Sequence, residues 1–181
     1  DIFVLHDAED VIHPLELKLF NHLIAHNDLI QIPVFPFQRK WYDLTAGHYE
    51  DEFAENHGKD LIVRESILGF VPSAGVGTAL SRKAIERLQE IHDGEVFSID
   101  TLTEDYSLGY ELFKEKMKLI FVRVPAELEY TTRNRYDQIT SGKKQVLITV
   151  REFFPSTFKK AVNQKSRWLT GIALQGWQKI G

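Results

Sequence analysis

Residues 2–14 read IFVLHDAEDVIHP, a short apolar run that ends directly in a cluster of charged side chains. The run Ile2–Leu5 predicts a buried strand, and Asp7, Glu9 and Asp10 follow it. Carboxylates gathered at one strand end repel one another, and a divalent cation would relieve that repulsion. Ligands of α/β sheets also bind outside the carboxyl ends of strands. The alternative is that these carboxylates are simply solvated, as most charged side chains are.

Length and composition limit the possible function classes. With 181 residues and 43% hydrophobic content, the chain can bury one ordinary core, and we expect a single domain over residues 1–181. The net charge of −4, with both signs interspersed, argues against nucleic-acid partners. The lack of cysteine excludes disulfides, zinc–thiolate sites and cysteine nucleophiles. No apolar run reaches the ~18 residues that a membrane span needs.

Apolar periodicity and breaker residues predict strands that alternate with helices, which favours α/β layers. Pro14 begins a helix, Ser81 and Gly94 bound another, and Thr103 caps a third. The polar stretch 133–144 separates two strands, and residues 61–71 are of mixed character. The predicted strands are 2–5, 30–37, 118–124, 128–132 and 145–153, and the predicted helices are 14–24, 41–57, 81–92, 103–116 and 155–177.

The stretch LTEDYSLGYEL, residues 102–112, places two acidic side chains at a helix start. In the structural interpretation Thr103 caps the helix, while Glu104 and Asp105 favour the positive end of its dipole. A carboxylate in this position is also a rigidly placed proton acceptor. Taken alone, the motif favours the structural interpretation.

The loop PSAGVGTALSR, residues 72–82, is rich in glycine and leads into a helix. Backbone amides of such a loop can bind phosphate, but this one lacks the lysine of a nucleotide-triphosphate loop and the spacing of a dinucleotide fingerprint. Gly75 and Gly77 more readily indicate a close approach of the backbone to a bulky group, which includes another part of the protein.

The helix near the end of the chain contains the string Gln-x-x-Arg-Trp, formed by Gln164, Arg167 and Trp168. Average residue usage produces this string by chance in roughly one of a few hundred chains of this length. The alternative is an amphipathic helix whose basic residues are solvated. Its apolar residues would then face a core: Phe158, Val162, Leu169, Ile172 and Trp177.

Together and in this order, the motifs resemble those of the processive family 2 glycosyltransferases, the group that contains cellulose, chitin and hyaluronan synthases. Asp-Ala-Glu-Asp follows a strand, AGVGTALSR forms a small-residue loop, Thr-Glu-Asp begins a helix, and Gln-x-x-Arg-Trp lies near the end. The order and spacing agree over nearly the whole chain. The stretches 6–23 and 154–177 are more similar still to a bacterial inner-membrane branch of the family.

The resemblance implies a GT-A fold, of which this chain would be the C-terminal half, with a mixed sheet flanked by helices. It also implies inverting transfer of a hexose or N-acetylhexosamine from a nucleotide sugar, usually a uridine diphosphate sugar, to a glycan acceptor. The cofactor would be Mg²⁺ or Mn²⁺, and the product of processive members is a polysaccharide. In this view the chain is the acceptor- and metal-binding half of the catalytic domain.

The resemblance assigns roles residue by residue. Asp7 and Glu9 match the metal and diphosphate motif, whose second carboxylate is more often aspartate, so Asp10 is an alternative ligand. Asp105 matches the general base and Glu104 its neighbour. The segment that closes over the donor diphosphate and the acceptor sugar, and the loop that forms the acceptor floor, correspond to Gln164, Arg167, Trp168, Gly75, Gly77 and Thr78.

The chain ends also fit this family. It opens on Asp1 within a predicted strand and stops at Gly181 after an apolar-aromatic run, so we expect a fragment of a longer membrane protein. Family members carry membrane helices beside this domain, which would face the cytoplasm at the bacterial inner membrane. The lysines and aromatic residues of the last predicted helix suit the cytosolic headgroup layer, and a plain core helix is the alternative.

Other functions remain open from the sequence. A degenerate GT-A module could bind a sugar nucleotide or a glycan, or act as a docking surface, without turnover. A phosphohydrolase with an aspartate nucleophile would need a nearby lysine or hydroxyl motif that the chain does not contain. The stretch HYEDEFAENH, with His48, Glu52, Glu55 and His57, matches no common metal-ligand spacing and predicts a solvated helix face.

Overall fold

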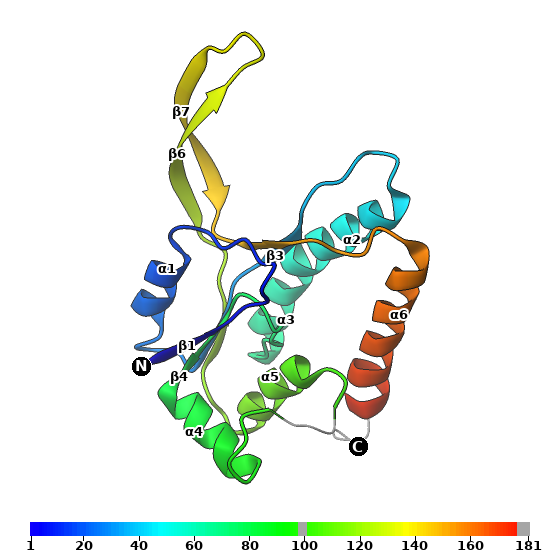
Figure 1. Ribbon diagram of the computed structural model, residues 1–181. Coiled ribbons are helices and arrows are strands. Elements are labelled where there is room, and N and C mark those ends of the chain that lie inside the picture. Colours follow the sequence, from blue (N-terminus) through cyan, green and yellow to red (C-terminus); the bar gives the residue numbers. More distant parts are fainter. Residues whose placement is uncertain (98–100, 177–181) are drawn as a thin grey trace.

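The computed structural model describes residues 1–97 and 101–176, which form a mixed sheet flanked by helices (Figure 1). The central sheet has four strands in the order β1, β4, β2, β5, where β4 is antiparallel to both neighbours and β2 is parallel to β5. The α/β class and the mixed sheet expected from the sequence are thereby confirmed. The strand bounds are β1 Ile2–Leu5, β4 Thr78–Ser81, β2 Leu29–Gln31 and β5 Leu119–Phe121.

The helices occur where the sequence supplies caps and apolar faces. The Asp43 side chain accepts a hydrogen bond from the Ala46 N–H, and Ser81 likewise accepts from Ala84. Gly69, with φ of 65°, ends the run of α2, η1 and α3. The bounds are α1 Glu16–Leu23, α2 Leu44–Glu55, the π-helical turn η1 Asn56–Asp60, α3 Leu61–Leu68, α4 Arg82–Ile91, α5 Glu104–Lys114, α6 Phe158–Trp168 and the π-helical turn η2 Leu169–Gln175.

The two faces of the central sheet carry separate parts of the core, because successive residues of a strand point to opposite faces. Ile30 on β2 pairs with Ala79 on β4, and both belong to the cluster that contains Phe20 of α1. Leu29 pairs with Leu80, and both belong to the cluster that contains residues of α3, α4 and α5. Helix α1 therefore covers one face of the sheet, and α3, α4 and α5 cover the other.

Two predicted strands are each divided between sheets. The predicted strand 30–37 is β2 and then β3 Val34–Pro36, because Pro33 has no N–H to continue the ladder. The predicted strand 145–153 is the end of β7 Ile139–Leu147 and then β8 Val150–Glu152. Strands β3 and β8 pair in parallel as a separate two-stranded sheet. This second sheet carries the chain from the core toward the helices α2 and α6 (Figure 1).

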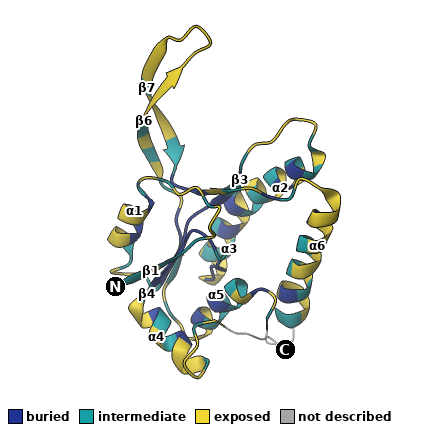
Figure 2. Cartoon of the chain, in the orientation of Figure 1, coloured by how far each residue is buried: buried dark blue, intermediate teal, exposed yellow. Residues whose placement is uncertain are grey.

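Other predicted boundaries were wrong. Residues Thr78–Ser81, assigned to a loop and a helix start, form the strand β4. The mixed stretch 61–71 contains helix α3, and the predicted helix 41–57 begins only at Leu44. The polar stretch 133–144, expected to separate strands, belongs largely to an antiparallel hairpin of β6 Pro125–Arg133 and β7, which projects from the body and is mostly exposed (Figures 1 and 2).

The last predicted helix is α6 followed by η2, and its predicted end at Trp177 lies outside the described residues. Across the parts of the chain that the structure describes, none of the helices combines the length and the apolar character that crossing a membrane requires.

Candidate active site

A cavity of about 320 Å³ brings together three of the motifs found in the sequence. Asp105 of α5, Trp168 of α6 and Ala74 of the glycine-rich loop all line it. The rest of the lining comes largely from α2, η1 and α3 and includes Phe53 and His57. Segments that are far apart in the chain therefore line the same cavity.

Asp105 lies in the first turn of α5, and one of its carboxylate oxygens accepts a hydrogen bond of 2.7 Å from the Tyr106 N–H. Burial raises its pKa above the ordinary value of 3.8, and the neighbouring Glu104 carboxylate raises it further, against the Tyr106 N–H and the Arg167 charge. The carboxyl group is thus a better proton acceptor than a solvated aspartate.

Gly75 lies directly against Asp105. A Cβ atom added at Gly75 would come within 2.9 Å of Asp105 Oδ2, and the backbone φ of 79° is in the left-handed region. Its N–H donates to Ser73 Oγ at 3.1 Å, which fixes the peptide in place. The close approach expected of the glycine-rich loop is therefore an approach to the Asp105 carboxylate.

The other two expected floor residues are packed below the cavity. A Cβ atom at Gly77 would come within 2.8 Å of Val150 and 3.0 Å of Ile32, which are both in the core. Thr78 is fully buried, and its hydroxyl donates to Gln31 Oε1 at 2.7 Å. Gly75, Gly77 and Thr78 therefore do not line the cavity, to which the loop contributes Ser73, Ala74 and Val76.

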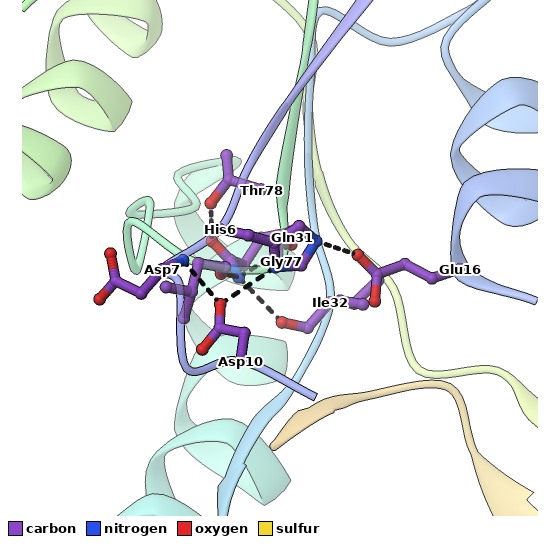
Figure 3. A network of polar contacts seen from close by, with 9 residues as sticks. His6, Asp7, Asp10, Glu16, Gln31, Ile32, Gly77 and Thr78 are labelled. Carbon is purple, nitrogen blue, oxygen red and sulfur yellow. Dashed lines mark hydrogen bonds and ion pairs between the residues drawn. The ribbon is translucent and has the colours of Figure 1, made fainter. Parts of the chain in front are cut away.

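Gln31 organises this loop and was missed in the sequence. Its fully buried amide group donates from Nε2 to the carbonyls of Ile32, Val76 and Gly77, and its Oε1 also accepts from the Ala74 N–H. Figure 3 shows Gln31 beside Ile32, Gly77 and Thr78. The available signal was one amide side chain in the otherwise apolar strand LIQI, residues 29–32. Because buried polar groups need partners, such a residue indicates a buried network.

The Thr-Glu-Asp turn is in direct contact with η2, the turn that follows the Gln-x-x-Arg-Trp segment. The Leu102 N–H donates to Gln175 Oε1 at 2.9 Å, and a Cβ at Gly171 would meet Thr103 Oγ1 at 2.4 Å. Thr103 occupies the N-cap position, but its side chain makes no capping hydrogen bond, contrary to expectation, because its hydroxyl is turned into this contact. The turn η2 therefore sets where α5 begins.

Arg167 acts on the site through its charge, whereas Trp168 lines the cavity. The Arg167 charge lowers the pKa of both Asp7 and Asp105, so its guanidinium lies within electrostatic reach of both carboxylates. Trp168 lines the cavity and packs against Phe53, with ring centroids 6.1 Å apart. The Gln164 Oε1 atom is buried and has no hydrogen-bond partner among the described residues.

The carboxylates after β1 lie in two different environments. Asp7 and Glu9 are exposed, whereas the side chain of Asp10 is only 1% exposed and is turned inward (Figure 3). Burial raises the pKa of Asp7, and the charges of Asp10 and Glu9 raise it further. The repulsion expected from the sequence is therefore present.

A further carboxylate, Glu152 of β8, joins this cluster and was missed in the sequence. Backbone hydrogen bonds in both directions between Val11 and Arg151 bring β8 beside the loop after β1. Burial raises the pKa of Glu152 to about 7, and the charges of Asp10, Asp7 and Glu9 contribute. Glu152 also lines the cavity. No local pattern marked this residue, because the contact joins segments about as far apart as the chain allows.

The donor chemistry of this cluster fits a hard divalent cation such as Mg²⁺ or Mn²⁺, which carboxylate oxygens bind. Within residues 1–97 and 101–176, no group of His, Asp and Glu side chains is arranged to hold a metal ion by itself. A cation at Asp7 and Glu9 would need further oxygen ligands, and Mg²⁺ commonly takes them from substrate phosphates.

The other residues considered for metal binding, in the stretch HYEDEFAENH, lie in separate environments in the structure. Glu52 pairs with Lys165, Glu55 pairs with Lys59, and His48 is exposed. His57 is not on a solvated face as predicted, because the π-helical turn buries it against the cavity, where its Nδ1 accepts from the Val34 N–H at 3.2 Å. Burial lowers its pKa to about 4.

Comparison with known proteins agrees with this arrangement. Residues 2–180 match the family model described as glycosyl transferase family group 2. The chain is 51% identical over 176 residues to bacteriophage adsorption protein B of Escherichia coli strain K12, and equally to bacteriophage N4 adsorption protein B of Escherichia coli O157:H7. These alignments cover 97% of this chain and 24% of each relative, so the chain spans about a quarter of the length of the curated relatives it matches.

The match confirms the resemblance to family 2 glycosyltransferases found in the sequence, and both relatives are bacterial proteins. The mixed sheet flanked by helices is consistent with a GT-A glycosyltransferase domain. Since the family model covers nearly the whole chain and the relatives are 51% identical, the chain belongs to the family 2 glycosyltransferases.

Proposed function

We propose that this chain is the acceptor- and metal-binding half of an inverting glycosyltransferase domain, with Asp105 as its general base. The reaction moves a hexose or N-acetylhexosamine from a nucleotide sugar, most simply a uridine diphosphate sugar, to a glycan acceptor. The observation that carries the proposal is the half-buried Asp105 carboxylate on the wall of a cavity that it shares with Trp168.

Asp105 would take the proton from the acceptor hydroxyl as that oxygen attacks the anomeric carbon. Its raised pKa favours this step, because a base gains efficiency as its pKa approaches the operating pH. The Tyr106 N–H and the Gly75 backbone hold the carboxylate in one orientation. Glu104 lies outside the cavity lining and acts through its charge, which keeps the pKa of Asp105 high.

The leaving diphosphate develops negative charge that the site must stabilise. The exposed Arg167 guanidinium, within electrostatic reach of Asp7 and Asp105, supplies one positive charge at this place. Asp7 and Glu9 would hold Mg²⁺ or Mn²⁺, which supplies Lewis-acid stabilisation of the diphosphate when bound. The side chain of Asp10, the alternative ligand considered from the sequence, is turned inward and is 1% exposed.

Trp168 would present an aromatic face to a sugar ring in the cavity, with the half-buried Phe53 ring packed beside it. Gly75 would leave room for the base, because any side chain at this position meets the Asp105 carboxylate, and Gly77 and Thr78 anchor the same loop in the core. Gln164, whose buried carbonyl oxygen has no hydrogen-bond partner among the described residues, would bind the donor or the acceptor.

The exposed face of α6 would lie against the cytoplasmic side of the bacterial inner membrane, and adjacent segments of the longer protein would anchor it. An apolar groove of about 690 Å³ runs between α2 and α6, lined by Leu44, Phe158, Val162 and Leu169. Each of these four side chains is exposed, and Lys159 and Lys160 beside them are exposed as well. Apolar residues flanked by lysines suit an anionic lipid surface.

The test is release of nucleoside diphosphate by the full-length protein in membrane vesicles. A panel of uridine diphosphate hexoses and N-acetylhexosamines, with and without Mn²⁺, is compared for the wild type, Asp105→Asn and the control Asp60→Asn. We expect metal-dependent release from one donor, reduced on the order of 10²-fold or more by Asp105→Asn and unchanged by the exposed Asp60→Asn.

Binding of a donor without release, unaffected by Asp105→Asn, would contradict the proposal and favour a non-catalytic module that binds sugar nucleotides. The length of the product, measured on the same vesicles with a radiolabelled donor, separates processive polymer synthesis from a single transfer.

A further inference from the structure

His6, the last residue before the motif Asp7–Asp10, lies between two carboxylates. Its Nε2 is 2.6 Å from Glu16 Oε1, and its Nδ1 is 3.1 Å from Asp10 Oδ2 (Figure 3). The Glu16 side chain is fully buried, and that of Asp10 is 1% exposed. The imidazole therefore joins the end of β1, the motif loop and the start of α1 in one buried polar network.

The network acts directly on the backbone of Asp7. Asp10 Oδ2 accepts a hydrogen bond of 2.9 Å from the Asp7 N–H, in addition to its contact with His6. The Asp10 N–H donates back to the Asp7 carbonyl at 3.2 Å. These contacts close a tight turn over residues 7–10, which fixes the direction in which the Asp7 side chain projects from the backbone.

The far end of the network is anchored in the core. Glu16 begins α1, and its N–H donates to the His13 carbonyl at 2.9 Å. One turn later, Phe20 of the same helix is fully buried in the main core cluster. A displacement of the turn over residues 7–10 must therefore work against the packing of α1.

The network of His6, Asp10 and Glu16 lowers the stability of the fold. Asp10 Oδ1 and Glu16 Oε2 are both buried without a hydrogen-bond partner among the described residues. Buried carboxylates that are only partly satisfied destabilise a fold, and apolar residues of similar shape often replace such networks without loss. The network therefore calls for a reason other than stability, and it lies directly beside the site.

We propose that His6, Asp10 and Glu16 are positioning residues for Asp7, and that Asp10 is not itself a metal ligand. The inference rests on the proposed function, in which Asp7 and Glu9 hold the cation. Asp10 Oδ2 is already committed to the Asp7 N–H and His6, and its side chain is closed to solvent. Glu9 is exposed, so its carboxylate can turn toward a cation beside Asp7.

The experiment measures Mn²⁺ binding to the full-length protein by electron paramagnetic resonance, with UDP as a second ligand. Asp7→Asn defines the signal that belongs to this site. Asp10→Asn keeps an acceptor for the Asp7 N–H, whereas Asp10→Ala and His6→Ala do not keep the network. We expect Asp10→Asn to bind Mn²⁺ like the wild type, and the two alanine variants to bind it at least about tenfold more weakly.

Hydrogen exchange of the segment around Asp7, measured without metal, provides a second readout. Exchange should rise in Asp10→Ala and His6→Ala, but not in Asp10→Asn or in the control His22→Ala, which removes an exposed histidine from α1, the helix that begins at Glu16. The pair Asp10→Asn and Asp10→Ala retains His6, so the comparison holds even if His6→Ala does not fold.

Loss of Mn²⁺ binding in Asp10→Asn to the level of Asp7→Asn would make Asp10 a ligand and overturn the inference. Normal binding and exchange in Asp10→Ala would overturn it as well. Unchanged Mn²⁺ binding in Asp7→Asn would remove the metal assignment together with this inference. Diphosphate release and its dependence on Asp105 would still report separately on the proposed transfer.

Discussion

Glu152 offers a quantitative test of how the carboxylate cluster is built. Its pKa is raised from the ordinary 4.5 to about 7, first by burial and then by the charges of Asp10, Asp7 and Glu9. The folded chain therefore holds a proton on Glu152 that the unfolded chain has already released between these two values. The contribution of this group to stability is fully present below pH 4.5 and is lost as the pH rises through about 7.

The substitution Glu152→Gln imitates the protonated side chain at every pH. A shift from 4.5 to about 7 corresponds to at most about 3 kcal/mol, because each unit of pKa is worth about 1.4 kcal/mol and residual water reduces the effect. The variant should match the wild type near pH 4.5 and be more stable above pH 7. For a domain of this size, the full effect corresponds to roughly 6–12 °C in Tm.

Thermal unfolding of the purified chain, followed by calorimetry at pH 5 and pH 8 with a chelator present, measures this difference. Glu129→Gln is the matched control, because Glu129 is exposed on the projecting hairpin and should change Tm equally little at both pH values. Addition of Mn²⁺ should reduce the difference between Glu152→Gln and the wild type at pH 8. If Glu152→Gln is no more stable than the wild type at pH 8, Glu152 ionises in the folded chain without a free-energy cost. That result would refute the raised pKa of Glu152.

Two further substitutions test the loop beside the base and the exposed face of α6. Gly75→Ala places a Cβ 2.9 Å from Asp105 Oδ2 at a positive φ, so we expect a loss of about 1–2 kcal/mol of stability and at least a tenfold loss of diphosphate release. Gly47→Ala has open space and should retain full activity, and equal activity of both variants would contradict the contact. Phe158→Ser should lower co-flotation of the chain with phosphatidylglycerol vesicles about tenfold. The control Ile67→Ser should leave co-flotation unchanged, although Ile67 is 74% exposed and Phe158 is 77% exposed. Equal losses in the two variants would argue against an α6 membrane face.

Local patterns predicted the elements whose signals lie within a few residues. The strand Ile2–Leu5 has its predicted bounds, although it is a partly buried edge strand and not a buried one, and the helix predicted from Ser81 is α4, which the Ser81 side chain caps. The strand β4 was missed because its four residues directly follow a glycine-rich loop and are held by pairing with β1 and β2. Strands of this length depend on their neighbours more than on intrinsic preference.

The candidate site likewise contains residues that sequence patterns identified and residues that they missed. The sequence supplied Asp105, Gly75, Arg167 and Trp168 through motifs, and the resemblance to a family supplied their roles. It did not supply Glu152, whose importance depends on three carboxylates more than 140 positions earlier in the chain. Nor did it separate Asp10 from its neighbours, although Asp10 alone of the three motif carboxylates is turned into the protein.

The sequence by itself determined the α/β class, the order of the motifs and the family, because periodicity, capping and motif spacing are properties of short stretches. Only the tertiary structure decided which carboxylates are buried, which glycine touches the base, and which histidine holds the motif loop. These properties depend on burial and on charges a few ångströms away through space, and the chain sets such distances only when it folds.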